Sequence, residues 1–288
     1  RIDRTSVVSG ANNGIGLEVA AGLRGAGHHV IMACRSLQRC EAAKASLDAR
    51  RLPGSCECRL LDLDDYVSIR HFAAELQASA PSTELACLVN NAGVMGLPPG
   101  PDGSCSHWRP NHLGPYLLTR LLLPLMAPGG RVVTVASEAH HRGSLRIARD
   151  ERTGRRQLDS SGSGSWYAHY ACSKLCNVLM TAELSRRLQQ RHSTVTCSSV
   201  SPGRVNTGIF GNVPGALQSP LRWLAASCFQ TAAQGASTPL YAALSPELEG
   251  RHELYLHALQ PRRASAAARD PALAAELWQL SGEQVGLA

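Results

Sequence analysis

Short apolar runs and longer helical patterns alternate along the whole chain, and this order predicts the fold. Apolar runs typical of strands are found at 5–9, 29–33, 58–63, 85–90, 131–137, 194–200 and 253–257. Helical periodicity occurs between them, at 15–24, 37–49, 66–79, 109–126, 167–191 and 232–244. Repeated strand–helix units of this kind predict an α/β protein whose parallel sheet is wound on both faces by helices.

The same pattern predicts a single domain. No Pro-, Gly- or Ser-rich linker divides the alternation, and there is no internal repeat, so residues 1–288 are expected to form one three-layer sandwich of Rossmann type. Irregular segments at 95–107, 138–166 and 204–230 each follow the carboxyl end of an expected strand. Because ligands bind at that edge of an open α/β sheet, these segments are expected to form the substrate walls. The Ser- and Gly-rich stretch at 160–165 fits a tolerated insertion equally well.

Composition narrows the function classes. Hydrophobic residues make up 44% of the chain and charged residues 18%, which is ordinary for a folded protein and excludes a disordered one. The net charge of +7 suits anionic ligands or an anionic membrane surface. Basic residues are scattered and aromatic residues are few, so a nucleic-acid partner is not expected. The longest apolar run, 121–126, is too short to span a membrane and contains Pro124.

The start of the chain and its cysteines bear on its location. The chain begins at Arg1, almost directly before an apolar strand, so an upstream targeting segment or anchor is expected to be absent from it. Ten cysteines show no framework spacing, which favours reduced, packed thiols in an intracellular protein, either organellar or membrane-associated. The pairs Cys56/Cys58 and Cys172/Cys176 each lack the second half of a zinc site, so no metal is expected.

A glycine-rich turn joins the first expected strand to the first helix. Glycines let the backbone turn sharply and approach a pyrophosphate, while the N-terminus of the helix offers free N–H groups and a favourable dipole. The turn is therefore predicted to bind the phosphates of a dinucleotide. The residues of this predicted site are Ser9, Gly10, Asn12, Asn13, Gly14, Ile15 and Gly16.

The end of the second strand indicates which dinucleotide binds. NAD-specific proteins of this architecture carry an acidic residue there for the ribose hydroxyl, whereas this chain has Arg35, with Arg39 one helical turn later. A guanidinium suits a 2′-phosphate, so NADP (NADPH) is predicted; the alternative is that Arg35 is only a solvated charge. Asp62 and Leu63, at the end of the third strand, are expected beside the adenine, although Asp62 could instead cap the next helix.

A tyrosine and a lysine one helical turn apart suggest acid–base chemistry. Reduction of a carbonyl by hydride needs a proton for the alkoxide, and a tyrosine with a pKa of about 10 is a poor donor or base near neutral pH. Lys174 follows Tyr170 by four residues, so both side chains share one face, and the ammonium is expected to lower the pKa of the phenol. In isolation such a pair is a common surface feature, so its meaning depends on the motifs around it.

Those motifs occur in a familiar order. The glycine-rich turn is followed by Asn90-Asn91-Ala92-Gly93, Asn111, Ser137 and Tyr170-Ala171-Cys172-Ser173-Lys174. In this set the chain resembles the short-chain dehydrogenase/reductase family, over residues 4 to about 258. The segments 33–36, 111–114, 173–179 and 238–244 are similar to the retinol-dehydrogenase-like branch of that family.

The resemblance implies roles for individual residues. Asn111, Ser137, Tyr170 and Lys174 would be catalytic, with Ser137 holding the substrate oxygen toward Tyr170 and Asn111 positioning a water-linked proton path to Lys174. Tyr170 and Lys174 would also bind the cofactor. Further cofactor contacts are implied for Asn90, Ala92, Gly93, Pro202, Gly203, Val205 and Thr207.

The chain departs from the family pattern at several positions. Ser9 and Ala136 replace a usual Thr and Ser, and Ser201 stands where many members of the branch have His. Pro110 removes a backbone donor directly before Asn111, which could displace that side chain.

The stretch between Ser137 and Tyr170 is also longer than the family commonly has. It carries four arginines, which suggest a lid or a partner-binding loop, although a charge run is more often a solvated face. These are Arg149, Arg152, Arg155 and Arg156.

Two functions remain open at this level. The first is an NADPH-dependent oxidoreductase that transfers a hydride between nicotinamide and a carbonyl or alcohol, on a lipophilic retinoid-, steroid- or quinone-like substrate. The alternative is a non-catalytic nucleotide-binding subunit of a larger assembly, and a nucleic-acid or redox-sensing regulator ranks last. Peripheral membrane contact and a homodimer through the helix around Tyr170 are compatible with either of the first two.

Overall fold

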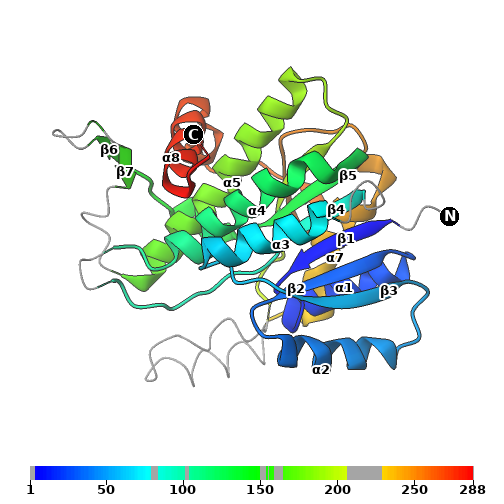
Figure 1. The fold of residues 1–288 in the computed structure, drawn as a ribbon. Coiled ribbons are helices and arrows are strands. Elements are labelled where there is room, and N and C mark those ends of the chain that lie inside the picture. Colours follow the sequence, from blue (N-terminus) through cyan, green and yellow to red (C-terminus); the bar gives the residue numbers. More distant parts are fainter. Residues whose placement is uncertain are drawn as a thin grey trace.

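A twisted sheet with helices on both faces forms the body of the protein (Figure 1). The computed structural model describes residues 4–78, 84–100, 104–149, 154, 156–158, 165–205 and 229–287. The strands of the sheet are β1 (Thr5–Ser9), β2 (His29–Cys34), β3 (Ser55–Leu60), β4 (Leu85–Asn90), β5 (Met126–Val135), β8 (Thr196–Ser201), β9 (Leu254–His257) and β10 (Gln260–Pro261). Their order is β10-β9-β8-β5-β4-β1-β2-β3, and all neighbours are parallel except β9 and β10.

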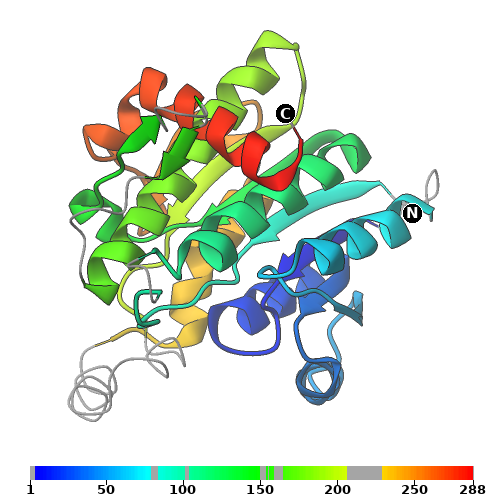
Figure 2. The same ribbon diagram turned by 60° about the vertical axis from the view of Figure 1, so that its left-hand side comes forward.

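Two helix layers cover this sheet. The long helices are α1 (Gly14–Gly25), α2 (Leu37–Asp48), α3 (Tyr66–Ala78), α4 (Gly114–Leu122), α5 (Trp166–Gln190), α7 (Ala232–Leu244) and α8 (Pro271–Val285). Helices α1, α2 and α7 pack on one face, and α3, α4, α5 and α8 on the other (Figure 1, Figure 2). Short helical turns are η1 (Arg109–Leu113), which is π-helical, and the 3₁₀ turns η2 (Leu123–Leu125), η3 (Glu138–Arg142), η5 (Pro246–Leu248) and η6 (Ala267–Arg269). The predicted fold class, a doubly wound α/β sandwich, is confirmed.

The apolar runs of the strands follow from this arrangement. A parallel sheet covered on both faces buries both sides of each central strand, so its strands read as continuous apolar runs rather than alternating ones. Val7 and Val8 of β1 are both fully buried, yet they belong to the two opposite cores.

Most element boundaries agree with the sequence pattern, and the exceptions have physical reasons. The strand expected at 58–63 is Ser55–Leu60, because its partner β2 ends at Cys34, which lies opposite Leu60. The helix expected at 109–126 is divided into η1, α4 and η2, and the chain enters β5 two residues after Pro124.

Helix α8 was not predicted, although its signals are present. Asp270 caps its first turn, Pro271 is its first residue, and Gly286 ends it in a left-handed conformation. These are standard start and stop residues of a helix, and the resemblance to the family ended before them.

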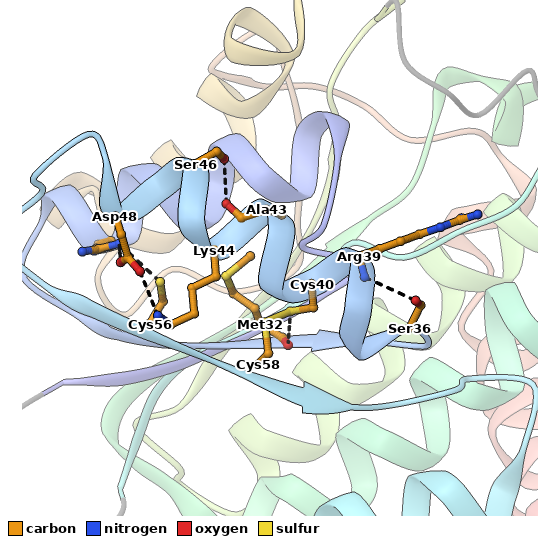
Figure 3. Close-up of a disulfide and its surroundings, with 11 residues drawn as sticks. Met32, Ser36, Arg39, Cys40, Ala43, Lys44, Ser46, Asp48, Cys56 and Cys58 are labelled. Carbon is orange, nitrogen blue, oxygen red and sulfur yellow. Dashed lines mark hydrogen bonds and ion pairs between the residues drawn. A yellow bond between two sulfur atoms is a disulfide. The ribbon is translucent and has the colours of Figure 1, made fainter.

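A disulfide joins Cys40 of α2 to Cys58 of β3, so the expectation of reduced thiols is wrong for this pair (Figure 3). Cys40 lies on the buried face of α2, which packs beside β3, and the two Cα atoms are 5.9 Å apart. This separation is one that a disulfide spans without backbone movement. Free thiols within the described residues are Cys34, Cys56, Cys87, Cys105, Cys172, Cys176 and Cys197.

The long segment before α5 holds short regular elements among its described residues. It contains η3 and a hairpin formed by β6 (Ile147–Arg149) and β7 (Arg156–Leu158). Arg156 pairs with Glu283 of α8, so this guanidinium is held against the protein's own surface. Arg152 and Arg155 lie outside the described residues, as does 206–228, which includes Thr207.

In the described part of the chain, no helix is both long enough and apolar enough to cross a bilayer.

Candidate active site

A cleft of about 920 Å³ runs along the carboxyl edge of the sheet, from the glycine-rich turn to α5. This is the edge at which ligands bind in doubly wound folds. Of the residues predicted to bind cofactor or to catalyse, those lining the cleft are Ser9, Gly10, Asn12, Asn13, Gly14, Ile15, Gly16, Arg35, Arg39, Asp62, Leu63, Ala92, Gly93, Ser137, Tyr170, Lys174, Pro202, Gly203 and Val205. Asn90 and Asn111 do not line it.

The glycine-rich turn leaves space and free amides for a phosphate. A Cβ atom on Gly16 would lie 2.3 Å from the carbonyl oxygen of Gly10, so only glycine lets α1 approach the turn this closely. Asn13, at the N-cap of α1, makes no side-chain capping bond, and the first turn holds no acidic residue. The N–H groups of that turn therefore fit an anionic ligand.

Hydrogen bonds from the two residues that follow β4 hold the turn in place. The hydroxyl oxygen of Ser9 accepts bonds from the backbone N–H groups of Asn91 and Ala92, both at 3.1 Å. The side-chain amide of Asn91 donates to the carbonyls of Ser9 at 2.9 Å and Gly10 at 3.3 Å. The Ser9 hydroxyl therefore stabilises the turn, and Asn91, which was not predicted as a site residue, does so from the position directly after β4.

The side chain of the neighbouring Asn90 faces away from the cleft, and the predicted contact of this residue with the cofactor stays a prediction. Its side chain is 2% exposed and donates to the hydroxyl of Thr119 on α4 at 2.8 Å. Side chains alternate between the two faces of a strand, so Asn90 faces the helix layer while its neighbour reaches the turn.

The predicted adenosine end lies between β2 and β3. Arg35 is exposed on the rim of the cleft, and the hydroxyl of Ser36 caps α2 by accepting from the N–H of Arg39. Leu63 is buried beneath the cleft. Asp62 accepts from the N–H of Asp64 at 2.9 Å, so its carboxylate stabilises the local turn.

The other end of the cleft brings Ser137, Tyr170 and Lys174 together. The hydroxyl of Ser137 accepts from the N–H of Ala139 at 3.2 Å and is hydrogen-bonded to Tyr170. The ammonium of Lys174 lies 5.7 Å from the centre of the Tyr170 ring. It donates to the carbonyl of Val135 at 2.9 Å. A substrate oxygen placed in the cleft between Ser137 and Tyr170 can meet two hydroxyl groups at once.

Burial determines the protonation of this pair. It raises the pKa of Tyr170 to about 12, although the hydrogen bond with Ser137 acts in the opposite direction. Burial also lowers the pKa of Lys174 to about 8. The expectation that Lys174 lowers the pKa of Tyr170 is therefore wrong here, because desolvation of the phenolate outweighs the other contributions.

Asn111 is held firmly despite the proline before it. It is fully buried, its side-chain oxygen accepts from the N–H of Val94 at 2.8 Å, and its amide donates to the carbonyl of Val94 at 2.9 Å and to Ser173 at 3.0 Å. Pro110 lies in the first turn of η1, where a missing N–H costs little. Asn111 therefore joins the segment after β4 to α5, and its part in a proton path to Lys174 stays a prediction.

Apolar side chains line the cleft next to Tyr170. Met95 and Leu97 come from the segment after β4, Ala139 from η3 and Tyr167 from α5. None of these was named as a site residue from the sequence, although the segments of Met95, Leu97 and Ala139 were expected to form substrate walls because they directly follow the carboxyl ends of strands. Tyr167 lies one residue beyond the expected wall at 138–166, in the helix pattern that begins at 167.

Comparison with known proteins agrees with this arrangement. The family model described as short chain dehydrogenase matches residues 4–148. Human dehydrogenase/reductase SDR family member 13 is 39% identical over 292 residues, which cover 99% of this chain and 74% of the human one. The chain belongs to the short-chain dehydrogenase/reductase family.

Other members of this family indicate its branch. Human retinol dehydrogenase 11 is 38% identical, covering 98% of this chain and 85% of its own. Human polyprenol dehydrogenase is 35% identical, covering 100% of this chain and 86% of its own. The protein is thus a short-chain dehydrogenase/reductase of the retinol-dehydrogenase-like branch, and as such an NAD(P)-dependent oxidoreductase.

Solved structures of the short-chain dehydrogenase/reductase fold superpose on this one. A protein from Mycobacterium paratuberculosis is 33% identical with a TM-score of 0.73, covering 98% of this chain and 93% of that one. A structure described as an NAD(P)-dependent gluconate 5-dehydrogenase from Beutenbergia cavernae contains NADP and is 27% identical, with a TM-score of 0.67 and coverage of 88% and 94%.

Proposed function

We propose that this protein is an NADPH-dependent oxidoreductase that transfers a hydride between nicotinamide and a lipophilic carbonyl or alcohol. The observation that carries the proposal is one continuous cleft. Its first end is formed by the first turn of α1, where Asn13 makes no side-chain capping bond, and its other end by Ser137, Tyr170 and Lys174. A bound nicotinamide supplies or accepts the hydride. Every other part of the reaction falls to side chains of this chain.

Ser137 and Tyr170 handle the substrate oxygen. Ser137 orients it by hydrogen bonding, and Tyr170 exchanges a proton with it. With a pKa of about 12, Tyr170 is protonated at neutral pH, which is the state that carbonyl reduction requires. An alkoxide is a stronger base than a phenolate, so the transfer from Tyr170 is favourable even at this raised pKa. Lys174, with a pKa of about 8, supplies a positive charge behind the phenol.

The substrate walls support a lipophilic substrate. Met95, Leu97, Ala139 and Tyr167 present apolar surface beside Tyr170. Burying such surface against an apolar ligand contributes roughly 25 cal/mol per Å². Two relatives are named for retinol and polyprenol, which are both long, apolar alcohols.

The alternative, a non-catalytic nucleotide-binding subunit, is not favoured. One of the features that left room for it was Pro110, which could displace Asn111, and Asn111 is instead held by hydrogen bonds to Val94 and Ser173.

The reaction is tested by following NADPH oxidation over a panel of lipophilic aldehydes, ketones and quinones. Loss of a positioned proton donor costs about a hundredfold or more, so Tyr170→Phe is expected to reduce kcat at least that far. NADPH binding by Tyr170→Phe, measured by fluorescence, is the control and should fall far less than kcat does. Turnover that survives in Tyr170→Phe contradicts the assigned role. Tight NADPH binding without any turnover supports the subunit instead.

Cofactor preference is tested at the rim of the cleft. Arg35→Asp removes a guanidinium suited to the 2′-phosphate and replaces it with an acid suited to a ribose hydroxyl. We expect the ratio of NADPH to NADH affinity to fall by at least about tenfold, since a hydrogen bond to a charged group contributes roughly 1.5–3 kcal/mol. Arg263→Asp makes the same charge change at an exposed position outside the cleft. An equal ratio in Arg35→Asp and Arg263→Asp would show that Arg35 does not read the phosphate.

A further inference from the structure

Three side chains that could hold a metal ion converge beside the substrate wall. Cys105 and His107 lie in the segment before η1, and His169 precedes Tyr170 on α5. The ligand atoms of the three side chains all lie within 4.8 Å of one another. Both imidazoles are buried, with His107 0% and His169 1% exposed, whereas Cys105 is partly accessible.

The state of His107 points to a missing ligand. Its Nδ1 atom is buried and has no hydrogen-bond partner, and its Nε2 atom has a long contact of 3.3 Å with the N–H of Leu97. An unpaired polar atom in the interior is unfavourable. A neutral imidazole carries a single proton, so an ion bound at Nδ1 places that proton on Nε2 and replaces the weak contact with Leu97.

The donor set selects the kind of ion. Two imidazoles and one thiolate are ligands that zinc prefers, and with three protein ligands the fourth tetrahedral position is left for water. We propose that Cys105, His107 and His169 bind one Zn²⁺ per chain. The zinc–sulfur bond forms as Cys105 releases its thiol proton to solvent, with no change in oxidation state.

The site has a consequence for the cleft. It joins the segment that carries Met95 and Leu97 to the helix that carries Tyr170, and the rings of His107 and Tyr170 are 6.1 Å apart. A bound ion therefore fixes the substrate wall against α5. It takes no part in hydride transfer, so the proposal stands independently of the proposed function.

Metal titration of the full chain tests the proposal. The protein is freed of metal with a chelator, without reductant so that the Cys40–Cys58 disulfide stays closed, and titrated with Co²⁺ as a coloured substitute for zinc. We expect one Co²⁺ per chain, a thiolate-to-cobalt charge-transfer band, and displacement by one Zn²⁺. Added Zn²⁺ is also expected to raise Tm, because an ion that binds only the folded state stabilises it.

Variants locate the ion. Cys105→Ser and His169→Asn are each expected to weaken Zn²⁺ binding at least about tenfold and to abolish the rise in Tm, and Cys105→Ser to remove the charge-transfer band. Cys197→Ser and His71→Asn, which lie outside the cluster, are matched controls that should bind as the unchanged protein does. Circular dichroism checks that each variant is folded. We expect Cys105→Ser to fold, because it changes one atom at a partly accessible position.

Three results would overturn the proposal. One is the absence of stoichiometric Co²⁺ or Zn²⁺ binding by the unchanged chain. Another is equal affinity in Cys105→Ser and Cys197→Ser. The third is loss of the charge-transfer band in Cys172→Ser while Cys105→Ser retains it, which would assign the ion to the neighbouring thiols of α5.

Discussion

Lys174 is an ammonium group in an unusual position, because it is 3% exposed and its hydrogen bond is to a backbone carbonyl. Burial of a charge without an opposite charge disfavours the charged form, which explains the lowered pKa. Gly93 makes room for it, since a Cβ atom there would lie 3.2 Å from the ammonium nitrogen. The buried ammonium of Lys174 therefore lowers the free energy of unfolding, and in return the site holds a positive charge next to Tyr170.

This cost predicts a pH dependence of stability. The pKa of Lys174 falls from its usual 10.5 to about 8, so between these pH values the unfolded chain binds a proton that the folded chain has lost. The free energy of unfolding therefore gains from this group as pH rises from 8 toward 10.5, by up to about 1.4 kcal/mol per pH unit. In urea denaturation the unchanged protein should gain stability relative to Lys174→Met over this range. A constant difference would mean that Lys174 titrates normally.

Spacing alone could place Tyr170 and Lys174 on one face, but it could not give their pKa values. Those depend on how deeply α5 is buried, and the helix pattern does not report that depth. Distance along the chain hid the cluster of Cys105, His107 and His169 in the same way, because 62 residues separate the last two.

At the level of elements, the pairing of α2 with β3 shapes the predicted 2′-phosphate end of the cleft. The Cys40–Cys58 disulfide holds the first turn of α2, directly after Arg39 (Figure 3). At the other end of the helix, Asp48 receives hydrogen bonds from Arg24 at 2.6 Å and Lys44 at 2.8 Å. Helix α2 is thus fixed at both ends.

Reduction of the Cys40–Cys58 disulfide should weaken the attachment of α2 to β3. A cross-link that closes a loop of this length stabilises a protein by about 3 kcal/mol. We expect a thiol reductant to lower the free energy of unfolding by about that amount and to weaken NADPH binding, both measured in urea titrations with and without the cofactor. The double variant Cys40→Ser/Cys58→Ser is the control, since reductant should no longer affect it. An identical response of both proteins to reductant would contradict the cross-link.

The first and last residues of an element could be predicted where local residues set them. They could not be predicted where the pairing with a neighbouring strand or helix sets them. The strand Leu85–Asn90 and the helix Ala232–Leu244 were predicted to the residue, because apolar runs and a Thr231 capping box mark them locally. The end of β3 depends on where β2 stops, and the disulfide depends on how α2 lies against β3. Neither is encoded in a local pattern.

Across the whole molecule, α8 completes the helix layer that contains α5 (Figure 2). Trp278 is 7% exposed, and its ring meets Tyr116 of α4 edge-on at 4.9 Å. The guanidinium groups of Arg120 and Arg187 lie 5.2 Å and 4.9 Å from its ring centre. One tryptophan thus joins α4, α5 and α8.

Removing this side chain should destabilise the entire fold. Trp278→Ala leaves a cavity and removes two cation–π contacts, and such truncations cost about 3–5 kcal/mol. Val67→Ala is the matched control, because Val67 is 75% exposed and surface substitutions change stability by about 0.5 kcal/mol or less. Thermal unfolding followed by circular dichroism compares the two. A similar Tm for both variants would mean that α8 is only loosely docked.

The two edges of the sheet affect how copies of this protein can meet. At one edge β10 has two residues, and Pro261 cannot donate a hydrogen bond to another strand. At the other edge β3 carries Glu57 and Arg59, which form an ion pair at 2.7 Å. Short, proline-containing and charged edges discourage strand addition, which is the usual start of aggregation. Concentrated solutions of the protein should therefore resist growth of intermolecular sheets, and contacts between copies are left to helices and loops.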